Sequence, residues 1–290
     1  MKIYNLGSLN IDYVYAVDHF VSAGETLASC GMQIFPGGKG LNQSIALARA
    51  GAQVIHGAVV GSDGGFLLET LAESGVDTSR IQSVDGSCGH AIIQVDPNGQ
   101  NSILLFAGTN HLIDRSYIDT FLADACEGDI LVLQNEVNGL DMIFAAAHEK
   151  KMHIAFNPSP FREELKELPL SYVKWWFCNE IEGEALFGSS DPMHIVETFA
   201  VQYPGSNLIL TLGSNGSVFS DGNKVVRQPI FPTKAIDTTA AGDTFTGYFL
   251  ASVTSGRTVE QALEVASRAS SITVSRKGAS ESIPYARELQ

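Results

Sequence analysis

The chain has 290 residues and a formal net charge of −14, from 18 basic and 32 acidic side chains. An acidic surface repels nucleic acid and anionic membranes, so neither is expected as a partner. Hydrophobic residues make up 44% of the sequence and charged residues only 17%, which excludes a disordered chain. The length fits one large α/β domain or two modest ones.

Targeting and cysteine patterns point to the same compartment. The four cysteines form no C-x-x-C pair, so neither a cysteine zinc site nor a disulfide framework is expected. The N-terminal segment alternates apolar and polar residues, as a strand does and a signal peptide does not. No apolar run reaches the length of about 18 residues that a membrane span needs. We therefore expect a cytoplasmic protein.

Short apolar runs predict strands at 2–6, 53–60, 129–134, 152–157, 172–178 and 207–212. Between them, apolar residues at helical spacing predict helices at 41–51, 64–75, 139–150 and 192–203. After residue 224 we expect a short strand, a Gly-rich turn and helices at 244–254 and 258–273. This alternation predicts a mostly parallel central sheet with helices on both faces.

Two stretches, at about 11–34 and 88–106, break this alternation with strand-like patterns. The run HAIIQVDPNGQNSILLFA predicts a hairpin around Pro97-Asn98-Gly99. We expect these stretches to pair outside the main sheet as a small β-sheet lid. The chain shows no repeat, low-complexity tract or linker, so residues 1–290 are interpreted as a single α/β domain.

The run DTTAAGD, at residues 237–243, precedes apolar residues at helical spacing, which places Gly242 and Asp243 at a helix N-terminus. Free N–H groups there attract anions, and glycine allows a phosphate to approach the backbone. Asp243 could accept a proton from a hydroxyl that attacks this phosphate. Asp243 could equally cap the helix, although a cap does not explain the small residues before it.

A second run, PGGKGLNQ, suits a polyol. Its glycines can bring backbone amides close to a ligand, Lys39 supplies a charge, and Asn42 can both donate and accept. The spacing does not match a P-loop. The alternative is an ordinary glycine turn before a helix, with a solvated lysine.

In the run GSLNID, Asn10 and Asp12 lie two residues apart, so they face the same side of a strand and could bind two sugar hydroxyls. The alternative is a polar turn at a strand end. Glu136, the run NEIE at 179–182 and the run TLGSNG at 211–216 also follow predicted strands. Carboxyl ends of parallel strands share one edge of a sheet, where α/β proteins bind ligands.

Taken together, GSLNID, GGKGLNQ, NPSP, NEIE, TLGSNG, DTTAAGD and TVSRKGASESIP make the chain resemble the ribokinase branch of the PfkB-type carbohydrate kinases. The resemblance covers essentially the whole chain. It implies a ribokinase-like three-layer α/β fold with a β-sheet lid, a homodimer formed by the lids, and ATP-dependent phosphorylation of a sugar. The leading hypothesis is transfer to O5 of D-ribose, which gives ribose 5-phosphate.

Site residues follow from the resemblance position by position. Asp243 would be the catalytic base, and an anion hole would be formed by Ala240, Ala241, Gly242 and Asp243. The sugar would be bound by Asn10, Asp12, Gly38, Lys39, Gly40, Asn42, Glu136 and Asp243. The nucleotide would be bound by Asn179, Thr211, Gly213, Ser214, Gly216, Gly242 and Ser267.

Two cofactors are also implied. Mg²⁺ would accompany ATP, ordered through water by Glu182. A monovalent cation, usually K⁺, would lie beside the anion hole and pin the loop that forms it. The ligands of this cation, several of them through backbone carbonyls, would be Asp237, Thr239, Thr273, Arg276, Gly278 and Ser282.

Departures from the family pattern concern the substrate more than the chemistry. Ser267 stands where histidine or asparagine is common near the adenine. His90 stands in the lid where a small apolar residue is expected, and it either bonds a further substrate hydroxyl or faces solvent. His90 and Phe106 leave open another sugar or a nucleoside as the substrate. A sugar-binding regulator is disfavoured because Lys39, Gly242 and Asp243 are present, and a nicotinamide oxidoreductase because no G-x-G-x-x-G turn follows the first strand.

Overall fold

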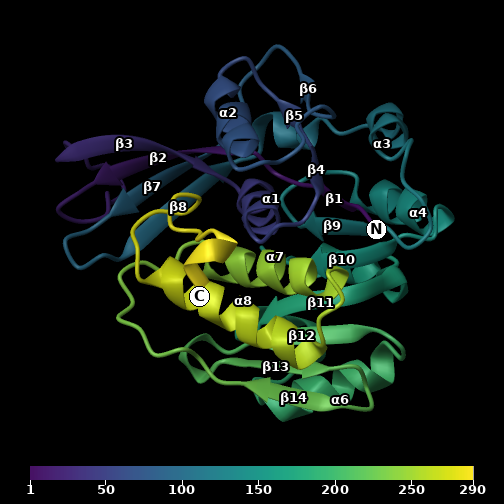
Figure 1. The fold of residues 1–290 in the computed structure, drawn as a ribbon. Coiled ribbons are helices and arrows are strands. Elements are labelled where there is room, and N and C mark those ends of the chain that lie inside the picture. Colours follow the sequence, from purple (N-terminus) through teal and green to yellow (C-terminus); the bar gives the residue numbers. More distant parts are fainter. Residues whose placement is uncertain (290) are drawn as a thin grey trace.

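The computed structural model describes residues 1–289. Its centre is an eight-stranded sheet in the order β14-β13-β12-β11-β10-β9-β1-β4 (Figure 1). Strands from β4 to β12 pair in parallel, and β13 and β14 add an antiparallel edge. The strands are β1 (Ile3–Leu6), β4 (Val54–Gly57), β9 (Ile130–Gln134), β10 (His153–Asn157), β11 (Val173–Asn179), β12 (Asn207–Thr211), β13 (Ser217–Ser220) and β14 (Val225–Gln228).

Helices cover both faces of this sheet (Figure 1). Alternate strand residues point to opposite faces; Val132 joins the core on one side and Leu131 the core on the other. The Val132 side is covered by α1 (Lys39–Arg49), α2 (Gly65–Glu73), α7 (Ala241–Thr254) and α8 (Val259–Val274). The Leu131 side is covered by α3 (Arg115–Phe121), α4 (Leu140–Glu149), α5 (Glu180–Phe187) and α6 (Pro192–Gln202).

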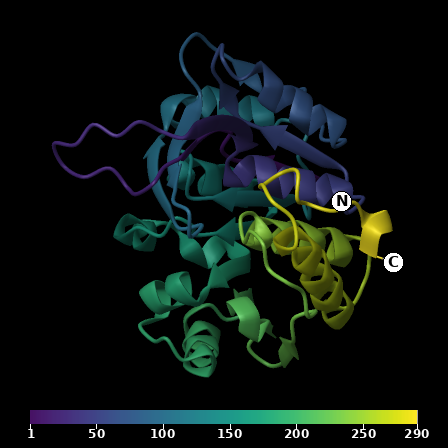
Figure 2. The ribbon, with the colours of Figure 1, turned by 90° about the vertical axis from the view of Figure 1, so that its left-hand side faces the viewer.

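A separate four-stranded sheet, in the order β3-β2-β7-β8, forms the lid. Its strands are β2 (Asn10–Ala16), β3 (Gly31–Gly37), β7 (Gly89–Val95) and β8 (Asn101–Phe106). The β7–β8 hairpin turns through Gly99, whose φ of 79° is a conformation that glycine adopts without strain. Figure 2 shows the segment between β2 and β3 projecting from the body as a long loop.

The remaining elements are short. Strands β5 (Val59–Val60) and β6 (Gln82–Ser83) pair in parallel as a two-stranded sheet. Four short 3₁₀ turns lie between longer elements, and they are η1 (Gly108–His111), η2 (Glu163–Glu167), η3 (Leu170–Tyr172) and η4 (Gly213–Asn215). A fifth, η5 (Ala286–Leu289), follows α8.

The predicted three-layer fold and its lid are confirmed, with local differences. The expected strand at 53–60 divides into β4 and β5, because β5 leaves the main sheet to pair with β6. Helix α3 and strand β13 were not predicted; α3 has only seven residues and depends on Asp114, whose carboxylate accepts a bond from the Tyr117 N–H at 2.7 Å. The NEIE run begins helix α5, where the sequence suggested a loop.

All four cysteines are free thiols, with Cys88 and Cys178 buried. Among residues 1–289, no helix combines the length and the apolar composition needed to cross a bilayer.

Candidate active site

Polar side chains gather where the direction of the sheet reverses. The chain runs outward from β1 to β4 on one side and from β1 to β9 on the other, so a topological switch lies between β1 and β9. Ligand crevices of open α/β sheets occur at the carboxyl ends of such strands. The segment after β1 meets the start of α1 here, where the Leu41 N–H donates to the Ser8 carbonyl at 3.0 Å.

Asp243 lies in the first turn of α7 and is only 8% exposed. Its carboxylate accepts hydrogen bonds from two amides of α1, from Asn42 Nδ2 to Oδ2 at 3.3 Å and from Gln43 Nε2 to Oδ1 at 2.9 Å. The N-cap of α7 is Ala240, and no side chain caps this helix. The capping alternative for Asp243 is therefore wrong, because its carboxylate faces α1 instead of its own helix.

The start of α7 has the form of an anion hole. Ala240 has a φ of 59°, a left-handed conformation that is uncommon for a residue with a Cβ and that marks functional sites. Ala241 N–H donates to the Thr238 carbonyl at 3.3 Å, whereas the N–H groups of Gly242 and Asp243 have no partner within residues 1–289. A Cβ placed on Gly242 would meet no atom within 4 Å, so this backbone opens onto free space.

Helix α1 begins against the β1–β2 turn. Gly38 has a φ of 96°, and a Cβ on Gly40 would lie 2.4 Å from the Gly7 carbonyl carbon, so both positions need glycine. Glu136 Oε2 accepts hydrogen bonds from the Lys39 N–H at 3.0 Å and from the Ser8 hydroxyl at 2.5 Å. Glu136 is thus fixed at the N-terminus of α1.

Lys39 is not the solvated lysine of the alternative interpretation. Burial lowers the pKa of its ammonium, but the carboxylates of Asp243, Glu136 and Glu182 outweigh burial and raise the pKa above its usual value. The same three carboxylates have predicted roles: Asp243 as the catalytic base, Glu136 in binding the sugar, and Glu182 in ordering Mg²⁺ through water. Lys39 therefore provides local positive charge at this edge of an otherwise acidic protein, which suits an anionic substrate.

Asn10 and Asp12 lie on one face of β2, as predicted. Asn10 is buried, and its Oδ1 accepts a bond from Asn110 Nδ2 at 2.7 Å. Burial and the nearby carboxylates of Glu136 and Glu281 raise the pKa of Asp12 to about 7. A carboxyl group held this way loses its water and needs partners, which sugar hydroxyls can provide.

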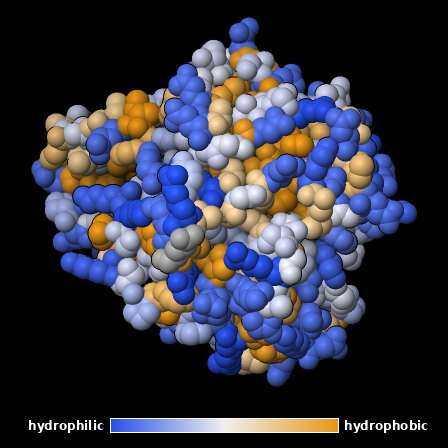
Figure 3. Space-filling view, in the orientation of Figure 1, coloured by the Kyte–Doolittle hydropathy of each residue, from blue (hydrophilic) through white to orange (hydrophobic). Residues whose placement is uncertain are grey.

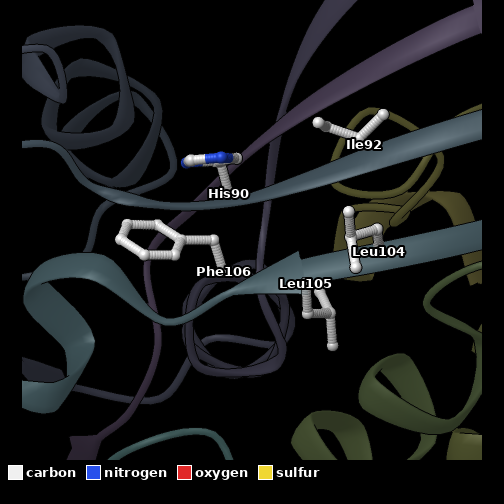
Figure 4. A pocket seen from close by; sticks show the side chains of 5 residues that line it. All are labelled: His90, Ile92, Leu104, Leu105 and Phe106. Carbon is white, nitrogen blue, oxygen red and sulfur yellow. The ribbon is translucent and has the colours of Figure 1, made fainter.

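His90 lies on the other face of the lid. The strand register pairs it with Ile11 and Phe106, whereas Asp12 pairs with Ala91. Its ring lies 5.0 Å from the Phe106 ring, and Figure 4 shows both on the same side of the hairpin, away from Leu105. His90 therefore does not reach the Asp12 side of the lid, and it rests on Phe106 instead of standing free in solvent.

The expected nucleotide and magnesium residues at the end of β11 form a capping box. Asn179 Oδ1 accepts from the Glu182 N–H at 3.0 Å, and Glu182 Oε2 accepts from the Asn179 N–H at 2.8 Å. The Asn179 amide also donates to Glu182 Oε1 at 3.2 Å. These bonds fix both side chains at the start of α5, and the Glu182 oxygens keep further lone pairs for water.

The loop after β12 is closed by its own backbone, with the Leu212 N–H donating to the Gly216 carbonyl at 2.8 Å. Gly216 has a φ of 87°, and a Cβ there would lie 2.1 Å from the Gln228 carbonyl oxygen. Gly213 and Ser214 form the turn between them. Ser267, on α8, donates its hydroxyl to the Pro229 carbonyl at 3.1 Å, so that hydroxyl is engaged within the protein.

The expected cation ligands come together from two distant segments. Asp237 Oδ1 accepts from the Thr239 N–H at 2.9 Å, and Asp237 Oδ2 accepts from the Gly278 N–H at 3.0 Å. Burial raises the pKa of Asp237, but these bonds outweigh it and lower the pKa below its usual value. Hydroxyl bonds join Thr273 to Thr244 at 3.0 Å and Ser282 to the Ala279 carbonyl at 2.7 Å, and the Arg276 guanidinium pairs with Glu288.

No cluster of three histidine, cysteine or acidic side chains with metal-binding geometry occurs within the described part of the chain. Carbonyl and carboxylate oxygens are nevertheless the ligands that suit hard cations. The loops around Asp237 and Gly278 supply both kinds, so the residues present fit a monovalent cation. Glu182 fits a role in holding water around Mg²⁺.

Four site residues escaped the sequence interpretation. Ser8 positions Glu136, Asn110 positions Asn10, and Gln43 and Gln134 are linked to Asp243. Gln43 stood inside the GGKGLNQ run and was assigned no role. Ser8 stood inside the GSLNID run and was likewise assigned no role. Asn110 and Gln134 contact their partners across about a hundred residues of sequence, so no local pattern marks them.

Comparisons with known proteins agree with this geometry. Residues 2–286 match the model of the pfkB family carbohydrate kinases. Ribokinase from Haemophilus influenzae is 35% identical over 98% of this chain and 95% of its own length. The crystal structure of ribokinase from Thermotoga maritima superposes with a TM-score of 0.89, at 33% identity, over 100% of this chain and 98% of that one.

A solved complex adds ligands to the comparison. Arabidopsis thaliana ribokinase, complexed with ribose and ATP, superposes with a TM-score of 0.86 at 27% identity and covers 99% of this chain and 97% of that one. The full-length family match, the identity above 30% and the shared fold agree with the residues assembled at the edge of the sheet. The chain belongs to the PfkB family of carbohydrate kinases.

Proposed function

We propose that this protein is an ATP-dependent ribokinase that transfers the γ-phosphoryl group of ATP to O5 of D-ribose. The observation that carries the proposal is the position of Asp243, whose buried carboxylate lies beside the unpartnered N–H groups at the start of α7. The relatives named ribokinase and the Arabidopsis complex with ribose and ATP support this choice of substrates.

The proposed sugar site lies between α1 and the lid. Asn42 Oδ1 is buried without a hydrogen-bond partner, and a sugar hydroxyl would satisfy it. Asn10 and Asp12 offer acceptors from β2, and Lys39 and Glu136 offer a donor and an acceptor from the opposite side. Gly38 and Gly40 let α1 begin directly against the β1–β2 turn, which brings Lys39 and Asn42 to this site.

In the reaction, the O5–phosphorus bond forms while the bond from the γ-phosphorus to the bridging oxygen breaks, and ADP leaves with that electron pair. The O5 proton passes to Asp243. A loose transition state spreads charge over the three peripheral phosphoryl oxygens. The N–H groups of Gly242 and Asp243 and the positive end of α7 would stabilise that charge, with Ala240 and Ala241 shaping the loop.

The nucleotide would extend from this anion hole toward the ends of β11 and β12. There it would meet Asn179 and the loop from Thr211 to Gly216, with Gly213 and Ser214 at the turn. Ser267 would border the adenine through its backbone and Cβ, since its hydroxyl is engaged. Mg²⁺ bound with ATP would neutralise phosphate charge, and Glu182 would hold its water.

A monovalent cation would stabilise the loop that forms the anion hole. Asp237 already joins this loop to the segment around Gly278. Oxygen ligands from Thr239, Thr273, Arg276 and Ser282 would complete the site. We assign K⁺ to it from the family resemblance.

The lid would also form a homodimer. Its face opposite Asp12 carries large apolar side chains that are 37% to 68% exposed, namely Met32, Ile34, Ile92, Leu104 and Phe106. Figure 3 shows apolar side chains gathered at the left of the molecule, where Figure 1 places the lid. An exposed apolar sheet face of this kind marks a protein interface.

We further propose that residues 1–290 act as a single cytoplasmic kinase domain.

A deoxyribokinase is the second candidate, because the enzyme of this name from Salmonella typhimurium is 31% identical to this chain. Ribose and 2-deoxyribose differ by one hydroxyl. A site that bonds this hydroxyl rejects the sugar that lacks it, because buried polar groups are left unpaired. ADP release measured with ribose, 2-deoxyribose, other sugars and nucleosides separates the candidates, and a clear preference for any substrate except ribose would contradict the proposal.

The test of the base is Asp243→Asn. Asparagine keeps the shape of the side chain but cannot accept a proton at neutral pH, so kcat should fall by about 10² to 10⁴ while the fold is kept. The matched control is Asp221→Asn, which removes a partly exposed carboxylate from a turn beyond β13 and should leave kcat unchanged. Near-normal turnover by Asp243→Asn would refute the assignment.

A further inference from the structure

A buried chain of side-chain amides runs beneath the candidate base. It links Asn5 at β1, Gln134 at the end of β9, Gln43 on α1 and Asp243 on α7. Gln134 Nε2 donates to Asn5 Oδ1 at 3.0 Å and to Gln43 Oε1 at 2.7 Å, and Gln43 Nε2 donates to Asp243 Oδ1 at 2.9 Å. The three amide residues are at most 1% exposed.

The hydrogen bonds that link these amides run in a fixed direction, because the series starts at a group that can only accept. The carbonyl of Gly40 accepts from Asn5 Nδ2 at 2.9 Å, and Ser44 Oγ accepts from the same nitrogen at 2.8 Å. This orients the Asn5 oxygen toward Gln134, whose amide nitrogen then faces Gln43. Gln43 must therefore present its nitrogen, never its oxygen, to Asp243.

The two carboxylate oxygens of Asp243 are therefore held differently. Oδ1 receives the shorter bond, from a donor whose own position is locked by burial and by Gln134. Oδ2 receives only the longer bond of 3.3 Å, from Asn42. The carboxylate is thus anchored through Oδ1, while Oδ2 faces the residues of the sugar site.

From this geometry we infer that Gln43, oriented by Asn5 and Gln134, is a positioning residue that fixes the carboxylate of Asp243 so that Oδ2 takes the proton of the sugar hydroxyl. The inference rests on the proposed function, since it needs Asp243 to be the base. Gln43 touches neither sugar nor phosphate in this scheme; it acts through Asp243. A misplacement of about 1 Å at a reacting group can cost about 10²-fold in rate.

The first test is Gln43→Met, which keeps the volume of the side chain and removes its hydrogen bonds. We expect kcat to fall about 10- to 100-fold, while KM for ribose changes less than about threefold. KM depends on how the sugar is bound and kcat on how the base is placed, so a fall in kcat without a matching change in KM is the sign of a positioning role. A purely structural role would lower stability without separating kcat from KM.

Two further variants test the direction of the hydrogen bonds between these amides. Gln134→Met leaves Gln43 in place but frees its amide to turn, so the same changes should appear to a smaller extent. Gln43→Glu can donate to Asp243 only when its own carboxyl is protonated, so its activity relative to Gln43→Met should rise as pH falls. The matched control is Asn207→Leu, which removes a buried amide at the opposite end of the sheet and should affect stability alone.

The outcomes separate the inference from the proposed function. If Asp243→Asn is inactive but Gln43→Met and Gln134→Met keep the wild-type kcat, the positioning inference is overturned and the function stands. If Asp243→Asn remains active, the base assignment fails first. A rise in KM alone after Gln43→Met would also overturn the inference, because it would place Gln43 in sugar binding.

Discussion

Asp12 gives a specific prediction about stability, because a carboxyl group buried at the proposed sugar site lowers the stability of the folded protein when it ionises. The perturbation is Asp12→Asn, which keeps the shape of the side chain and removes its charge. Burial and two neighbouring carboxylates raise the pKa of Asp12 from 3.8 to about 7 in the folded protein. The folded state therefore holds this proton over a range of pH in which the unfolded chain has released it.

The sign of the effect follows from this difference. Below about pH 4 the Asp12 carboxyl is protonated in both the folded and the unfolded state, so it does not affect the free energy of unfolding. As pH rises toward 7, Asp12 ionises in the unfolded chain but not in the folded protein, and the free energy of unfolding falls. Each unit of pKa difference is worth about 1.4 kcal/mol, so the full penalty approaches about 4 kcal/mol above pH 7. Most of it, about 2.5 kcal/mol, develops between about pH 5 and 8.

The assay is urea denaturation of wild type and Asp12→Asn across this range, without sugar. The variant should become progressively more stable than wild type as pH rises, by about 2.5 kcal/mol between about pH 5 and 8. Asp85→Asn, on the surface, is the control and should show a difference that does not change with pH. A constant difference for Asp12→Asn as well would refute the reasoning, and so would a gain that appears only at acidic pH.

The remaining predictions concern the cation and the lid. Exchange of K⁺ for tetramethylammonium should lower the kcat of the wild-type protein. Asp237→Asn should remove most of this response, because it breaks the bonds to Thr239 and Gly278. Equal wild-type rates in both salts would contradict a cation site. Leu104→Glu should shift the protein from dimer to monomer in light scattering, since the loss of a buried leucine is worth about 1.5–3 kcal/mol per subunit. Unchanged association of that variant would contradict the lid interface.

Much of the fold could be predicted because its signals are local. The apolar runs that became β9, β10, β11 and β12 are buried on both faces and need no partner to be recognised. The lid hairpin was evident from its turn residues. Helix α3 was not predicted, since its seven residues depend on a cap at Asp114 and on packing that the sequence does not reveal.

The site residues that could be predicted are likewise those with a local signal in the sequence. Asp243, Lys39 and Asn42 were visible because each lies in a run whose glycines mark a close approach of backbone to ligand. His90 shows the limit of this reasoning, since its role depends on which face of the strand it occupies. A shift of register by one residue would have placed it beside Asp12, and only the pairing with Ile11 and Phe106 settles its face.

Asp12 and Asp243, two carboxylates of the proposed site, have different surroundings. Asp12, with carboxylates nearby and no strong donor, has a raised pKa. Asp243 receives two amide donors and lies near the Lys39 ammonium. Donors and a cation favour the charged form of a carboxylate, and burial with like charges disfavours it. In the proposed mechanism the two aspartates therefore have different tasks: Asp12 would hold hydroxyls of the sugar, and Asp243, held by Gln43, would receive a proton.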